Sequence, residues 1–126
     1  MIYQVMIDGI KVDFVHHPFE LVEPAFHENQ IIFLGIKDIA AMKLHAIETS
    51  GNRAKDFVDI HFLLKEMTLK KMFKYYRKKY STEAVPKLKF WNSYLRFKRK
   101  SRRKTTFSRA CSKTNRVLEQ AQLTIF

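Results

Sequence analysis

The dipeptide Asp8-Gly9 constrains the fold most, because it separates two apolar segments near the start of the chain. The first segment runs from Ile2 to Ile7 and the second from Ile10 to Val15. Both positions of an Asp-Gly pair tolerate positive φ, which the tight turn of a β-hairpin requires. The sequence therefore predicts a β-hairpin over residues 2–15.

A loop, a short strand and three helices are expected after the hairpin. Residues 18–30 hold two prolines and predict a loop, and Ile31–Leu34 predicts a short strand. Helices are expected at about Ile36–Thr49 with Gly35 as N-cap, at Ala54–Met67, and from the N-cap Thr68 to about Tyr80. The predicted class is α+β: a partial mixed sheet, made of the hairpin and the short strand, packed with helices.

Composition excludes several classes of protein. The 126 residues are 46% hydrophobic, which is enough for a core and excludes a disordered chain. The single cysteine, Cys111, excludes an internal disulfide framework and suits a reducing compartment. No apolar segment approaches the roughly 20 residues that a membrane-spanning helix needs. We therefore expect a cytoplasmic protein without a membrane partner.

The positive charge is concentrated in the last third of the chain. Residues 1–86 hold 12 Lys/Arg and 11 Asp/Glu, whereas residues 87–126 hold 12 Lys/Arg and one acid, Glu119. We expect a domain over residues 1–85 and a basic tail over residues 86–126, which is either disordered or helical. The tail is either a nucleic-acid-binding arm or a non-native extension, and the abrupt loss of acidic residues without a recognisable helix pattern favours the extension.

In the first interpretation the arm would contact phosphates and stack on bases. The cations for the phosphate contacts would be Lys98, Arg99, Lys100, Arg102, Arg103 and Lys104. The aromatic side chains beside them are Phe90, Trp91, Tyr94 and Phe97.

Three polar residues stand where the local pattern favours apolar ones. Lys43 lies in the strongly apolar helix segment 39–47, Asp56 lies in the apolar stripe of the next helix, and Asp13 lies inside a strand. Each has an ordinary explanation: a lysine with its ammonium in water, a first-turn acid that favours the helix dipole, and a solvent-facing strand residue. Together they also suit a site for phosphate and a divalent metal ion.

The order of three motifs resembles the AbiEii/AbiGii family of nucleotidyltransferase toxins. GIKVDF at residues 9–14, followed by HPF at 17–19, resembles the strand that carries the family's third carboxylate. DIAAMKLHAI at 38–47 resembles its lysine-bearing helix, and KDFVDIHFLL at 55–64 resembles its final motif. The resemblance covers about half of the chain and implies a polymerase-β-like fold.

The resemblance also implies chemistry: transfer of a nucleotide from an NTP with Mg²⁺, a cognate antitoxin, and tRNA or another RNA as a partner. Asp13 would bind metal, Lys43 would contact the nucleotide phosphates, and Asp56 would be the acid of the last motif. Asp59 and Arg53 would support nucleotide binding.

Two departures from the family pattern limit these expectations. The family's first motif, a Gly-Ser turn followed by Asp-x-Asp, does not precede Asp13, and Met1 opens inside a strand. We therefore expect a truncated, inactive nucleotidyltransferase. The alternatives are a small basic nucleic-acid-binding protein that uses its Lys/Arg-rich C-terminal segment, and an unrelated α+β domain in which Lys43 and Asp56 form only an ion pair.

Overall fold

A β-hairpin opens the chain, as the Asp-Gly turn predicts. The computed structural model describes residues 1–50, 54–82, 87–101 and 116–120. Strand β1 (Ile2–Ile7) pairs antiparallel with β2 (Ile10–Val15), from Ile2 opposite Val15 to Ile7 opposite Ile10. At the turn φ is 50° for Asp8 and 77° for Gly9, so both residues use the positive φ that the sequence predicts.

One face of this hairpin is entirely apolar. Cross-strand partners share a face and successive residues alternate between faces, so the register groups six apolar side chains together. All but Val12 are exposed, and the group is Tyr3, Val5, Ile7, Ile10, Val12 and Phe14. Asp13 lies on the opposite, mixed face, across from Gln4.

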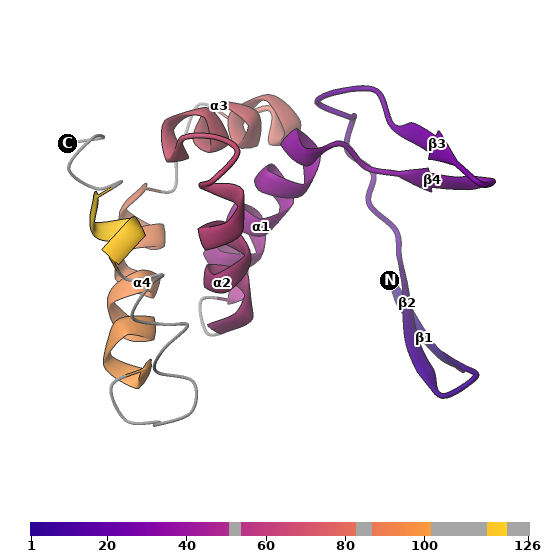
Figure 1. The fold of residues 1–126 in the computed structure, drawn as a ribbon, viewed down its shortest axis with the longest axis horizontal. Helices are drawn as coiled ribbons and strands as arrows, with labels where there is room; N and C mark the ends of the chain where they lie inside the picture. Colours follow the sequence, from indigo (N-terminus) through magenta and orange to yellow (C-terminus); the bar gives the residue numbers. More distant parts are fainter. Residues whose placement is uncertain (51–53, 83–86, 102–115, 121–126) are drawn as a thin grey trace.

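A second hairpin follows, which the sequence predicts only in part. Strand β4 (Ile31–Phe33) confirms the expected short strand, but its partner β3 (Phe26–Glu28) lies where a loop was predicted. The loop prediction is wrong there because three residues carry too little periodicity, and the turn residues Asn29 and Gln30 adopt positive φ without a glycine. The hairpins form separate two-stranded sheets and lie on the same side of the helices (Figure 1).

Helix α1 (Ile36–Ser50) begins where its N-cap was predicted. The Gly35 carbonyl accepts from the Ile39 amide at 3.1 Å, and the Glu23 carboxylate accepts from the Lys37 amide at 2.9 Å. A Cβ at residue 35 would overlap the Glu23 side chain. Glycine therefore allows a carboxylate from the preceding loop to meet the free amides of the first helical turn.

Helices α2 (Ala54–Leu63) and α3 (Leu69–Tyr80) follow α1. Helix α2 ends four residues before the predicted Met67, because the chain tightens into turns such as Lys65 N–H to the Phe62 carbonyl. The predicted cap of α3 is confirmed, since Thr68 accepts from the Lys71 amide at 3.3 Å. Ser81 ends α3 in the left-handed conformation.

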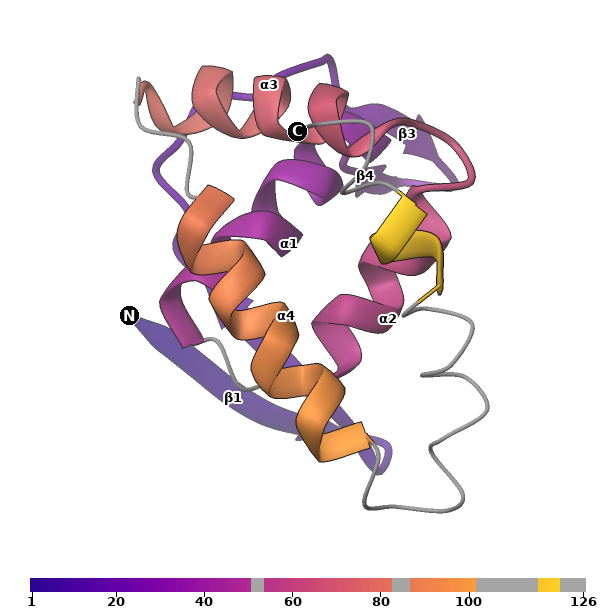
Figure 2. The ribbon, with the colours of Figure 1, turned by 90° about the vertical axis from the view of Figure 1, so that its left-hand side faces the viewer.

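Helix α4 (Lys87–Ser101) lies in the segment where no helix pattern was expected, so that expectation is wrong. Its aromatic side chains share one core with α1, α2 and α3, and Leu118 from the short helical segment 116–120 joins them. In both views α3 lies across one end of the other helices (Figure 2).

The α+β class is confirmed. No helix among the described residues is long and apolar enough to span a bilayer. The largest apolar side chains that are fully buried are Tyr94, Phe57, Phe90, Leu44, Ile47, Ile60, Met72 and Leu118.

Candidate functional site

Lys43 of α1 meets two carboxylates of α2. Its Nζ lies 3.3 Å from Asp56 Oδ1 and 2.6 Å from Asp59 Oδ2. Asp56 is 1% exposed, Lys43 32% and Asp59 43%, so the cluster runs from the core to the surface. Asp56 and Asp59 are one helical turn apart, and that spacing allows both to reach the same ammonium.

The electrostatics of this cluster keep Lys43 charged. Partial burial opposes the charged ammonium, but hydrogen bonds and Coulomb attraction from Asp59 and Asp56 outweigh burial and raise the Lys43 pKa. An ammonium has three N–H donors, and the two carboxylates use two of them. The third donor and the exposed part of the side chain suit contact with an anion such as a phosphate oxygen.

Asp13 lies apart from this cluster. It is exposed on β2, where its carboxylate is 3.7 Å from Lys11 Nζ, and the hairpin extends away from the helices (Figure 1). Within residues 1–50, 54–82, 87–101 and 116–120, no three His, Cys, Asp or Glu side chains gather as metal ligands. The Lys43 ammonium also occupies the space between Asp56 and Asp59 that a cation would need. These residues therefore do not fit a Mg²⁺ ion as they stand.

The predicted nucleic-acid-binding arm is only partly within the described chain. Lys98 pairs with Glu119 and Arg99 is exposed. Arg53, Arg102, Arg103 and Lys104 lie outside the described residues, as does the side chain of Lys100. The four aromatic residues predicted to stack on bases are instead 2–7% exposed, so that expectation is wrong: they pack in the protein core. These residues are Phe90, Trp91, Tyr94 and Phe97.

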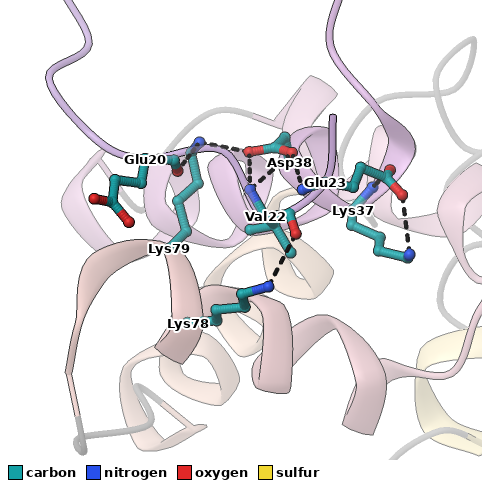
Figure 3. Close-up of polar contacts among 7 residues, drawn as sticks. All are labelled: Glu20, Val22, Glu23, Lys37, Asp38, Lys78 and Lys79. Atoms are coloured by element: carbon teal, nitrogen blue, oxygen red, sulfur yellow. Dashed lines mark hydrogen bonds and ion pairs between the residues drawn. The ribbon is translucent and has the colours of Figure 1, made fainter. Parts of the chain in front are cut away.

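A fully buried ion pair was missed from the sequence. Lys79 Nζ of α3 lies 2.6 Å from Asp38 Oδ1 of α1, and both side chains are 0% exposed. Asp38 also accepts from the Val22 amide at 3.0 Å and from the Glu23 amide at 3.2 Å (Figure 3). Lys79 donates in addition to the Glu20 carbonyl at 3.2 Å. The pair therefore fastens the loop between the two hairpins to the helices.

The charge of this buried acid is stabilised by its hydrogen bonds. Burial disfavours the Asp38 carboxylate, but the Lys79 ammonium and the Val22 and Glu23 amides outweigh burial and hold the Asp38 pKa below its usual value. The sequence did contain a signal for Lys79. Its spacing from Met72 and Tyr76 puts it on the apolar stripe of α3.

Comparison with known proteins supports the motif resemblance over nearly the whole chain. Residues 5–119 match the family model described as nucleotidyl transferase AbiEii toxin, type IV toxin–antitoxin system. This match extends well beyond the three motifs, which end at residue 64. No curated protein and no solved structure matches the chain. With most of its length covered by the family model, and with the lysine and the carboxylates of two motifs in contact, the chain belongs to the AbiEii family of nucleotidyl transferase toxins.

Proposed function

We propose that this protein acts in nucleotide transfer from an NTP and that Lys43 binds the nucleotide's phosphates. The supporting observation is the contact of Lys43 with both acids of the KDFVDIHFLL motif, which fixes the ammonium while one N–H donor stays available. In nucleotidyl transfer the protein mainly positions the phosphates and stabilises their charge. A fixed, permanently charged lysine suits that task.

The two carboxylates have different roles in this proposal. Buried Asp56 holds Lys43 in place. Asp59 is exposed, and the incoming phosphate replaces it as a partner of the Lys43 ammonium. As the resemblance implies, Arg53 would contact phosphate, and Asp13 would become a metal ligand only when further carboxylates complete the site. The family's cognate antitoxin would control the activity, and RNA, tRNA in the first instance, would be the acceptor.

We also propose that the chain does not transfer nucleotides by itself. Mg²⁺ would supply the charge that neutralises the triphosphate, yet Asp13 and the Lys43 cluster belong to separate parts of the described structure. Transfer would then require carboxylates from elsewhere. The family's reaction needs metal ligands that the described residues do not bring together.

Calorimetric titration with ATP and Mg²⁺ tests the phosphate contact. Lys43→Met should abolish binding, and Lys55→Met, which removes an exposed cation from the same helix pair, should leave it unchanged. Asp59→Asn should tighten binding, because it removes a negative charge that repels phosphate. Equal binding by the Lys43 and Lys55 variants would exclude this role for Lys43.

Incubation with labelled NTPs, tRNA and Mg²⁺ tests the second proposal. We expect no labelled RNA from this chain alone. Label that appears with the wild-type chain and disappears with Asp13→Ala would show a working active site and contradict the proposal.

A further inference from the structure

The outer face of α3 carries only positive charge. Five exposed cations, none of them used in the Lys43 cluster, lie on this helix at spacings of one, three and four residues. At 3.6 residues per turn these positions fall within an arc of about 120°, and no apolar side chain shares that arc. The buried stripe of α3 occupies the opposite side. We call the five residues the α3 basic face: Lys70, Lys71, Lys74, Arg77 and Lys78.

Few contacts among the described residues compensate this charge. Lys78 donates to the Val22 carbonyl at 3.0 Å, but the other four form no ion pair within the described part of the chain. By contrast, Lys89 and Lys98 of α4 pair with Glu48 and Glu119. The α3 basic face therefore presents unpaired cations to solvent.

Helix stability does not account for the arrangement either. Arg77 and Lys78 lie in the last turn, where cations favour the helix dipole. Lys70 and Lys71 lie in the first turn, which contains no acid and where a positive charge is unfavourable. Lys74 is within one turn of cations on both sides, and such like-charge pairs destabilise a helix. An external anion would relieve both effects.

We propose that the α3 basic face binds the phosphate backbone of a polynucleotide. A row of lysines and an arginine along two helical turns matches a regularly spaced line of phosphates, and binding of this kind is largely independent of sequence. The arc has no apolar side chain to enter a bilayer, which disfavours an anionic membrane as the partner. The α3 basic face shares no residue with the Lys43 cluster, so its binding to a polynucleotide can succeed or fail independently of nucleotide binding at Lys43.

Fluorescence anisotropy with a labelled single-stranded RNA, without NTP or Mg²⁺, tests the proposal on the full chain. The triple variant Lys70→Gln, Lys71→Gln, Lys74→Gln should weaken binding by up to about 100-fold near 0.1 M salt. The slope of log K against log salt should become shallower by about 2, because each lost phosphate contact contributes about 0.7 on a single strand. The same variant should unfold at an equal or higher temperature, because two of its cations oppose the dipole of α3.

A matched triple variant separates a local interface from net charge. Lys55→Gln, Lys65→Gln, Lys89→Gln removes three exposed cations from α2, the turn after it and α4, and should leave affinity and slope nearly unchanged. Equal losses of RNA affinity in both triple variants would mean that binding depends on net charge alone, and would overturn the proposal. Unchanged binding in the α3 variant would overturn it too, as would α3-dependent binding to phosphatidylserine vesicles without binding to RNA.

Discussion

Lys79→Met should destabilise the protein strongly, because it leaves the Asp38 carboxylate buried without its countercharge. Nζ and Oδ1 are 2.6 Å apart and both side chains are fully buried. Removing one member of a buried ion pair costs about 3–5 kcal/mol. Asp38 keeps its hydrogen bonds from the Val22 and Glu23 amides, so we expect a value near the lower end, about 3 kcal/mol.

Urea unfolding followed by the fluorescence of Trp91, the only tryptophan of the chain, measures this loss. With an m-value of about 1.5 kcal/mol/M, the midpoint should fall by about 2 M. Amide exchange gives a local measurement, because the Val22 and Glu23 amides should exchange faster when the loop, no longer held by Lys79, opens more often. Lys37→Met is the control: Lys37 pairs with Glu23 at the surface, and its removal should not shift the midpoint measurably.

A second substitution tests the cause of the loss. Asp38→Asn in the Lys79→Met background removes the uncompensated charge while keeping an oxygen for the two amides, so it should restore part of the stability. The reasoning would be refuted by a Lys79→Met midpoint within about 0.3 M of the wild type. A double variant less stable than Lys79→Met alone would refute it as well.

Three further predictions follow from the structure. The folded-state pKa of Asp38 is depressed, so its contribution to stability is complete above the unfolded pKa of about 3.9 and is lost as pH falls through the lower folded-state pKa. The urea midpoints of wild type and Asp38→Asn should therefore converge in acid. Phe97→Ala should cost about 3–5 kcal/mol in urea unfolding, since its ring stacks on Phe57 at 4.9 Å in the core, whereas Leu95→Ala on the exposed side of α4 should be nearly neutral; equal effects would contradict the packing of α4. The exposed apolar face of the β1–β2 hairpin should make the wild-type chain associate as its concentration rises in sedimentation velocity. The double variant Val5→Lys, Ile10→Lys should lower this association, because it places charges on that face. Unchanged association would mean that this face is not the contact.

Local signals were enough to predict most of the fold. The Asp-Gly turn, the Thr68 cap and the apolar stripes depend on residues close in sequence, and the structure confirms the hairpin and three helices from them. Strand β3 is too short to show periodicity. Helix α4 did carry a signal, because Phe90, Tyr94 and Phe97 recur at helical spacing, but dense Lys/Arg residues obscured it. The proposed boundary near residue 86 stays a prediction.

The candidate site was predictable to a similar extent. Lys43 and Asp56 were identified because each breaks an apolar pattern, and the structure puts them in contact. Whether Asp13 joins them depends on how the hairpin docks, and no local pattern encodes that. Lys79 breaks its pattern in the same way, but it was hidden among other lysines of α3 because composition alone does not separate exposed from buried cations.

The β1–β2 hairpin has a consequence for the order in which the chain folds. Within its strands, the paired residues farthest apart in sequence are Ile2 and Val15, whereas the Asp38–Lys79 pair closes a separation of 41 residues. Hairpins form within about 1–10 μs, and closing longer separations is slower. The hairpin therefore forms before the helices assemble. A partly folded chain thus presents the apolar face of the hairpin to solvent while the helices are still assembling, and this favours association with other chains at that stage.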